Sequence, residues 1–126
     1  MTHFLYVAAG GAIGAGCRHF VGMAALKFFG SGFPYGTLVC NIGGSFLMGI
    51  LVHILAIKFN AGAELRLFLT TGLLGGFTTF STFSLDAVIL TERGQTETAL
   101  IYIAISLAGS IAALYTGLLF ARQVLT

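Results

Sequence analysis

Hydroxyl and amide side chains inside otherwise apolar stretches are the groups in this sequence best suited to binding a ligand. Such groups are costly in hydrocarbon unless they line a cavity or pair with one another. They recur every four residues in two stretches, a spacing that places each set on one face of a helix. Neither set contains a full charge, so both are expected to line a polar track for a small ion: Thr37, Asn41 and Ser45 in one stretch, and Tyr102, Ser106 and Ser110 in the other.

Asn41 has more binding capacity than the hydroxyl residues that share its face. Serine and threonine often bond back to their own helix, so a lone hydroxyl would have a structural role. The Asn41 side chain instead carries two N–H donors that its own helix cannot readily use. We therefore predict that Asn41 and the residues on its face line the track.

A third polar set lies in the segment 75–84, which reads GGFTTFSTFS. Two glycines followed by five hydroxyl residues in seven positions make poor sequence for a continuous helix, because glycine adds backbone freedom and serine and threonine compete for backbone hydrogen bonds. We expect a break at about 75–81. Broken helices at membrane depth persist only where protein or an ion uses the freed groups. Freed carbonyls could bind a small cation, and freed N–H groups an anion.

Two phenylalanines of this segment are expected to border the track. Phe80 and Phe83 stand three residues apart and would share one face of the half-helix that follows the break. Taken alone they are ordinary packing residues, but an aromatic ring has a positive edge. A ring edge beside hydroxyl and amide donors suits a small anion that must shed water. The absence of full positive charge from the track favours conduction over storage, since an ion must also be able to leave.

The composition predicts an all-α membrane protein. The 126 residues are 57% hydrophobic and 8% charged, whereas a soluble domain averages about 25% charged residues. A single channel domain over residues 1–126 is expected, with its N-terminus retained and both termini on one side. Its four transmembrane helices would span about 4–28, 35–57, 64–90 with the break in its middle, and 98–121.

Other residue types limit the possible functions. Cys17 and Cys40 fall in apolar stretches without metal-ligand spacing, so both are expected to be buried free thiols. The net charge of +2 comes without a basic run, which argues against nucleic acid as a partner. The chain has no nucleophile with a base, paired carboxylates or phosphate loop, so no enzyme is predicted.

The positive charges provide no orientation signal, and this permits an antiparallel homodimer. Three lie on the side of the termini and three on the other side, although so few charges also allow the reading that they decide nothing. Four helices barely enclose a pathway, whereas eight can. Small residues in the spacing that brings membrane helices together are expected to pack helix on helix: Gly10 and Gly14, and Gly109, Ala113 and Gly117.

With these motifs in place, the sequence closely resembles the Fluc (CrcB) family of fluoride channels over its whole length. The resemblance rests on the segment 75–84, on the glycine-rich first span that ends at Arg18, on the segment 36–45, and on the spaced Tyr102, Ser106 and Ser110. The family implies a dual-topology antiparallel homodimer with two fluoride pathways. It also implies a multi-pass location in the inner membrane of a bacterium.

The resemblance assigns roles to particular residues. A structural sodium ion would be held by the main-chain carbonyls of Gly75 and Thr78, and Arg18 would lie at a vestibule or form a structural salt bridge. Asp86 occupies an acidic position where relatives often carry glutamate, which leaves its role open. The fluoride pathway would be lined by Asn41, Phe80, Phe83, Thr37, Ser81, Thr79, Tyr102, Ser106 and Ser110.

The function expected from the resemblance is passive, selective export of fluoride that protects the cytoplasm. One alternative is a proton-coupled small multidrug exporter, which needs a titratable carboxylate in its membrane core. Asp86 is the only deep candidate for that carboxylate. The other alternative is a non-conducting assembly subunit, which would explain the glycines but not the polar stripes.

Overall fold

A computed structural model describes residues 1–57 and 62–125, and these residues form helices and short connections only. The third predicted span is divided into several segments, whereas the other three are single helices within a few residues of the predicted limits. The predicted turn at 58–62 lies mostly outside the described residues. The helices are α1 Thr2–Phe29, α2 Tyr35–Ile57, α3 Ala63–Leu67, η1 Phe68–Leu74, α4 Gly75–Phe77, α5 Phe80–Glu92 and α6 Thr96–Val124.

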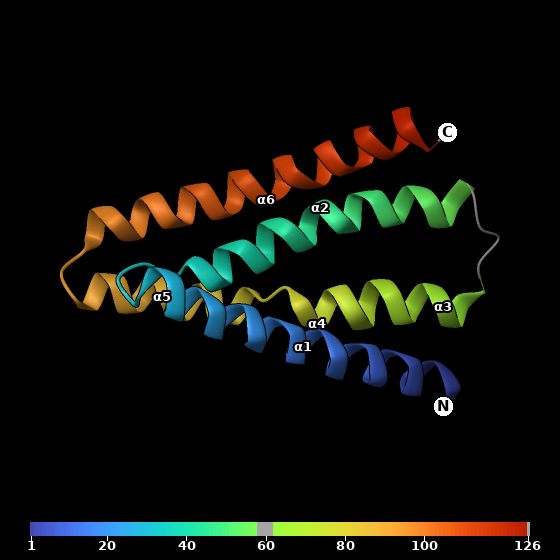
Figure 1. Ribbon diagram of the computed structural model, residues 1–126, viewed down its shortest axis with the longest axis horizontal. Helices are drawn as coiled ribbons and strands as arrows, with labels where there is room; N and C mark the ends of the chain where they lie inside the picture. The colour runs from blue at the N-terminus through green and yellow to red at the C-terminus, as the bar shows by residue number, and fades with distance from the viewer. Residues whose placement is uncertain (58–61, 126) are drawn as a thin grey trace.

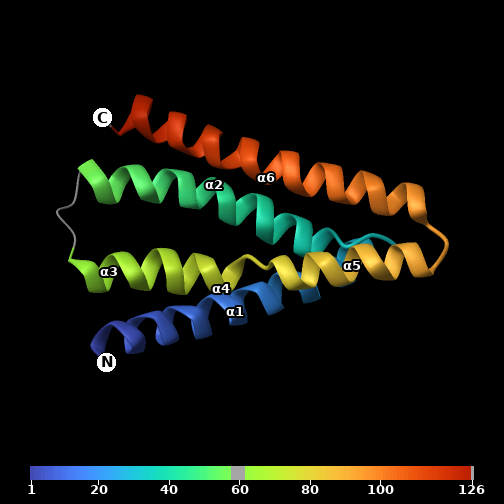
Figure 2. The ribbon, with the colours of Figure 1, turned by 180° about the vertical axis from the view of Figure 1, so that it is seen from behind.

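The helices run side by side along one long axis, and both termini lie at the same end of the bundle, as predicted (Figures 1 and 2). Helix α2 packs most extensively on α6, and α1 packs most extensively on η1 and to a lesser, equal extent on α2 and α4. Helices α5 and α6 meet at the opposite end, beside the connection between α1 and α2. This arrangement brings the two polar stripes and the broken helix together.

Three helices in the described part of the chain are long and apolar enough to cross a membrane: Tyr35–Ile57, Ala63–Glu92 and Thr96–Val124. The second of these counts α3, η1, α4 and α5 as one span. Helix α1 has 28 residues, enough to span a bilayer, but it contains Arg18 and His19, which make it less apolar. The chain is therefore a helical membrane protein with three clear spanning segments and a fourth long helix.

Glycines bring α1 into backbone contact with the third span. A Cβ on Gly14 would collide with the Leu73 carbonyl and would lie 2.8 Å from the Phe77 nitrogen. A Cβ on Gly10 would lie 2.8 Å from the Leu73 nitrogen. These two buried glycines are a small-residue contact of the kind predicted, and they set the height of α1 against the helix that breaks.

A second small-residue contact joins α2 to α6. A Cβ on Gly117 would collide with the Phe46 carbonyl, and one on Gly49 would collide with the Leu114 carbonyl. Farther along α6, a Cβ on Gly109 would lie 3.0 Å from Ile42. The predicted packing of the Gly109 and Gly117 spacing is confirmed, and it places the polar faces of α2 and α6 next to each other.

Replacing Gly14 with alanine is expected to lower the free energy of unfolding by about 1–3 kcal/mol, because the added methyl forces α1 away from η1. Thermal unfolding in detergent, followed by circular dichroism, measures this effect. Gly16→Ala is the matched control, since nothing lies within 4 Å of a Cβ at that position. Equal unfolding temperatures for the two variants would contradict the close packing of α1 on η1.

The predicted break in the third span is confirmed and is narrower than expected. The helix is continuous through the π-helical segment η1 to Phe77, and Thr78 and Thr79 are extended, with ψ of 156° and 121°. Helix α5 begins at Phe80, where Thr79 Oγ1 accepts a hydrogen bond from the Thr82 N–H at 3.2 Å. Thr79 is thus the N-cap of the second half-helix, the position at which threonine competes well with helical backbone bonding.

The expectation for the cysteines is wrong for one of the two residues. Both are free thiols, and Cys40 is buried between helices, but Cys17 is exposed. Gly14, three residues earlier, lies on the face of α1 that contacts the third span. Apolar surroundings in sequence did not reveal which face of α1 points inward.

Candidate ion pathway at the break in the third span

Asn41 of α2 replaces hydrogen bonds that the broken helix has lost. Its Oδ1 accepts from the Thr79 N–H at 2.7 Å, and its Nδ2 donates to the Thr79 carbonyl at 3.0 Å. A backbone N–H only donates and a carbonyl only accepts, so this double contact determines which way the amide points. One of the two N–H groups on Nδ2 is used in this contact, and the second is left for another acceptor.

The break also releases main-chain carbonyls. In a continuous helix the Thr79 N–H would donate to the Gly75 carbonyl, and the Thr82 N–H would donate to the Thr78 carbonyl. Here the Thr79 N–H donates to Asn41, and the Thr82 N–H donates to Thr79 Oγ1. Both carbonyls predicted to bind sodium have therefore lost their helical donors, and carbonyl oxygen is a ligand type that suits a hard cation.

Arg18 of α1 contacts a third carbonyl of the break. Its Nε donates to the Gly76 carbonyl at 3.1 Å, across 58 residues of sequence. Gly76 lies directly against α1, where a Cβ would be 2.6 Å from the Gly11 carbonyl oxygen. Arg18 is thus held at the break by a main-chain contact, and it forms no salt bridge with any residue that the structure describes. Its remaining guanidinium N–H groups are not used in that contact.

A cavity of about 230 Å³, here called the break cavity, lies beside this segment. It is bordered by α2, by the extended residues of the break, by α5 and by α6. Ser45 and Thr78 are among its lining residues, and none of the described residues that line it is ionisable. It brings together six of the predicted pathway residues: Asn41, Thr79, Phe80, Phe83, Ser106 and Ser110.

The Ser106 hydroxyl is the buried polar atom with unused capacity beside the break cavity. Ser106 is 4% exposed, and its Oγ has no hydrogen-bond partner of good geometry among the described residues. Buried hydroxyls are normally satisfied, so an unpaired one beside a cavity indicates a position where a ligand or water can bind. Ser106 can donate to an anion there, because a hydroxyl rotates to suit its partner.

Tyr102 contacts a residue of the break cavity and a residue of a second cavity. It is fully buried, and its ring lies 5.4 Å from Phe83, while Phe83 lies 5.3 Å from Phe80, centroid to centroid. The Tyr102 hydroxyl donates to Asp86 Oδ2 at 3.0 Å. The predicted track residue on α6 is therefore engaged with the acidic residue on α5, and Phe80, Phe83 and Tyr102 form a row of ring contacts.

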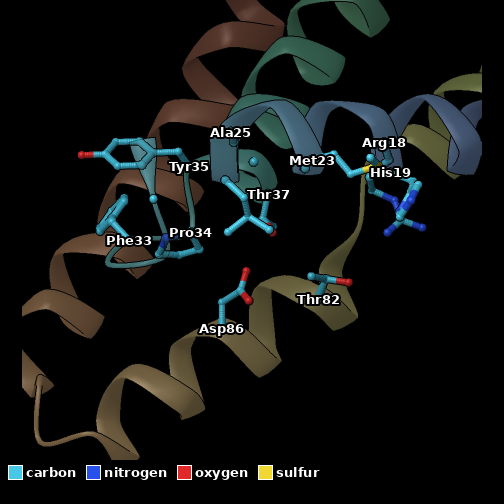
Figure 3. A pocket seen from close by; sticks show the side chains of 14 residues that line it. Arg18, His19, Met23, Ala25, Phe33, Pro34, Tyr35, Thr37, Thr82 and Asp86 are labelled. Carbon is cyan, nitrogen blue, oxygen red and sulfur yellow. The ribbon is translucent and has the colours of Figure 1, made fainter. Parts of the chain in front are cut away.

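The second cavity, here called the loop-end cavity, measures about 360 Å³ and lies beside the connection between α1 and α2. Thr37 and Asp86 face each other across it, and Thr82 lies next to Asp86 on α5 (Figure 3). Arg18 also lines it from α1. Thr37 and Asn41 are one helical turn apart on α2, so the two cavities follow one another along that helix.

Three predicted site residues lie outside the lining of both cavities: Tyr102, which is buried, and Ser81 and Gly75. Ser81 and Gly75 are exposed on the surface of the chain, although Ser81 Oγ approaches Thr79 Oγ1 at 3.4 Å. Phe80 lines the break cavity although the residue is 72% exposed. Thr71, one turn before Gly75, is exposed as well. Polar backbone and hydroxyls thus reach the chain surface at the level of the break, where lipid would leave them unsatisfied.

Sequence reasoning missed two features of the site. It treated Asn41 only as a lining residue, although the amide closes the hydrogen bonding of the break. It also left Thr82 without a role, although the side chain lines the loop-end cavity. The signal for Thr82 was its position among the five hydroxyl residues of the segment 78–84, but the periodicity gave no way to choose its face.

The fold and these cavities define a class: a helical membrane protein whose uncharged polar groups converge on a broken helix, as in proteins that pass ions. Comparison with known proteins agrees with this class. The family described as CrcB-like protein, Camphor Resistance (CrcB) matches residues 5–118. The chain belongs to this family.

Curated relatives match almost the whole chain. A protein of Chelativorans sp. (strain BNC1) named "Fluoride-specific ion channel FluC" is 54% identical over 125 residues, which cover 99% of this chain and 100% of the relative. Proteins with the same name from Agrobacterium fabrum (strain C58) and Rhizobium meliloti (strain 1021) are 52% and 48% identical over 124 residues. Each of these alignments covers 98% of this chain and 99% of the relative.

Proposed function

We propose that this protein is a fluoride-selective channel that passively exports fluoride across a bacterial plasma membrane. The break cavity is the observation that carries the proposal. It offers donors without full charge from Asn41 and Ser106, next to the first N–H groups of α5. Neutral donors can replace part of the water around a small anion without holding it permanently. The relatives' printed name supports fluoride as that anion.

Ion efflux from liposomes tests this function. Pure protein is reconstituted with internal potassium fluoride or potassium chloride, and each anion is followed with an ion-selective electrode after valinomycin is added. Fluoride is expected to leave rapidly while chloride stays. Chloride efflux as fast as fluoride efflux would contradict selectivity, and no efflux of either ion would contradict the channel.

Each chain is proposed to span the membrane four times, with α1 as the first span. An ion would enter the loop-end cavity near Arg18, pass Thr37 and Tyr102, and reach Asn41 and Ser106. Ser110 lies one turn beyond Ser106, also in the break cavity. Arg18 would raise the local anion concentration from the cavity wall without standing between the two polar stripes.

The functional unit is proposed to be an antiparallel homodimer. Support comes from the surface at the break, where Thr71, Gly75, Ser81 and the Phe80 ring are exposed in one chain. A second copy would cover polar backbone that lipid cannot satisfy. Cysteine labelling at one position in cells, with thiol reagents applied from each side of the membrane, tests this orientation. Labelling from a single side only would contradict dual topology.

A structural sodium ion is proposed to bind the Gly75 and Thr78 carbonyls, since both have lost their helical donors. Complete replacement of sodium by N-methyl-D-glucamine is expected to reduce fluoride efflux to the level of protein-free liposomes. The exchange must be long enough for a trapped ion to leave, with re-addition of sodium as the control for intact protein. Undiminished efflux after full exchange would contradict the sodium site.

The ring edge of Phe80 is proposed to contact the passing ion. Phe80→Ile is expected to slow fluoride efflux about two- to tenfold, because an aliphatic side chain lacks the positive ring edge, and edge contacts of aromatic rings contribute about 0.5–1.5 kcal/mol. Phe20→Ile is the matched control, since Phe20 is 71% exposed and Phe80 is 72% exposed, but Phe20 lies outside the break cavity. Equal efflux in the two variants would remove Phe80 from the pathway.

The proton-coupled exporter is the weaker proposal because of the surroundings of Asp86. That carboxylate accepts the Tyr102 hydroxyl and shares its cavity with Arg18. Proton-driven uptake of a lipophilic cation into liposomes would favour the exporter. A purified chain that conducts without partners would argue against an assembly subunit.

A further inference from the structure

The Thr79 peptide connects the break cavity to the freed carbonyls. We infer that the Asn41 amide couples the cation site to the anion pathway: by taking the Thr79 N–H, it keeps the Gly75 carbonyl free of its helical donor and fixes itself as a donor toward the break cavity. The inference rests on the proposed fluoride and sodium sites. In it Asn41 is a positioning residue for the cation site as well as a lining residue of the pathway.

A single N–H group decides both arrangements. If the helix were continuous, the Thr79 N–H would occupy the Gly75 carbonyl, and the Asn41 Oδ1 would have lost its donor. In the broken helix, the Thr79 N–H occupies Asn41 Oδ1 at 2.7 Å, and the Gly75 carbonyl is available. Binding of a cation to that carbonyl therefore favours the double hydrogen bond between the Asn41 amide and the Thr79 peptide, here called the clip. Reciprocally, the clipped amide favours cation binding, because linkage between two binding equilibria acts in both directions.

The clip also decides the sign of the ion that Asn41 can receive. Its oxygen and one N–H are used on Thr79, so the remaining N–H is the group it can offer to another ligand. The hydroxyls of Ser106 and Ser110, which line the same cavity, can rotate to donate or accept. Among these neighbours the amide is thus the one held as a donor. A free amide could turn its oxygen to the cavity and receive a cation instead.

Sodium-dependent thermal stability tests the coupling without relying on conduction. Unfolding temperatures of the dimer in detergent are measured by circular dichroism as sodium replaces N-methyl-D-glucamine at constant ionic strength. The wild type is compared with Asn41→Ala, which removes the clip, and Asn41→Asp, which keeps an acceptor for the Thr79 N–H. Leu47→Ala is the control for shortening an exposed side chain on the same helix.

The sodium concentration that produces half of the stability increase is expected to rise about tenfold in Asn41→Ala, in line with typical coupling between sites. Asn41→Asp is expected to retain the wild-type sodium response although it conducts poorly, and Leu47→Ala is expected to behave as the wild type. A full wild-type sodium response in Asn41→Ala would overturn the inference and leave the proposed function intact. A wild type without any response would overturn the sodium site and the inference together.

Amide hydrogen exchange keeps the test decisive if Asn41→Ala does not fold. The Thr79 N–H is expected to be protected in the wild type and in Asn41→Asp, where an oxygen acceptor remains. Its protection is expected to fall when sodium is removed, because the clip and cation binding favour each other. Thr79 protection that is independent of sodium in both proteins would overturn the coupling.

Discussion

Fluoride efflux from liposomes is expected to fall about 1000-fold when Asn41 is replaced by aspartate. The introduced carboxylate would stand where the amide now leaves an N–H for a ligand beside the break cavity. Two like charges 4 Å apart repel by about 4 kcal/mol at an effective dielectric constant near 20. Each 1.36 kcal/mol is a factor of ten in rate, so the repulsion corresponds to nearly three orders of magnitude.

Asn41→Ala separates the added charge from the lost donor. It removes the N–H without introducing a negative charge, and a hydrogen bond to a charged group is worth about 1.5–3 kcal/mol. At saturating sodium its efflux is therefore expected to lie between those of the wild type and Asn41→Asp. Ion-selective electrode recordings at matched protein-to-lipid ratios measure the order of the three efflux rates. Efflux from Asn41→Asp that equals or exceeds that of Asn41→Ala would contradict an anion pathway past this position.

Arg18→Met is expected to reduce fluoride efflux about tenfold or more and to lower the unfolding temperature. Loss of the Arg18 Nε leaves the Gly76 carbonyl without this donor at the break. An unsatisfied buried carbonyl costs about 1–3 kcal/mol, and even the partial cost at this partly buried carbonyl would favour closing the break into a continuous helix. The loop-end cavity would also lose the positive charge that attracts anions.

Two further variants distinguish position from charge. Lys27→Met removes a positive charge from the same helix, but Lys27 lies over the Phe28 ring near the end of α1 rather than at the break. Its efflux is expected to stay close to that of the wild type. Arg18→Lys keeps the charge but not the planar guanidinium that supplies Nε, and it is expected to remain slow. Wild-type efflux in Arg18→Lys would show that Arg18 acts through its charge alone.

Local sequence patterns were sufficient to predict the helices and the break. The apolar composition required helices because a bilayer offers no partner for main-chain groups. The glycines and hydroxyl residues of the segment 75–84 predicted the break, and the structure places it at Thr78 and Thr79. The four-residue spacing also predicted the shared faces of Asn41 with Ser45 and of Ser106 with Ser110, which meet in one cavity.

Contacts between helices could not be predicted from local sequence patterns. The Asn41 and Thr79 contact spans 38 residues, and the contact of Arg18 with Gly76 spans 58. Each depends on how one helix is rotated and shifted along its axis relative to another. For α1, the close approach at Gly14 fixes both. Cys17 was placed wrongly for the same reason, since helical periodicity groups residues by face but does not say which face turns inward.

The sequence by itself therefore determined that the chain forms membrane helices, that the third span breaks, and that uncharged donors form stripes on two other spans. These are properties of local backbone preference and hydropathy. Only the tertiary structure decided that Asn41 clips the Thr79 peptide, that Arg18 holds the Gly76 carbonyl, and that Tyr102 engages Asp86. Such contacts join residues far apart in sequence, so they exist only once glycine-mediated packing has fixed how the helices lie against one another.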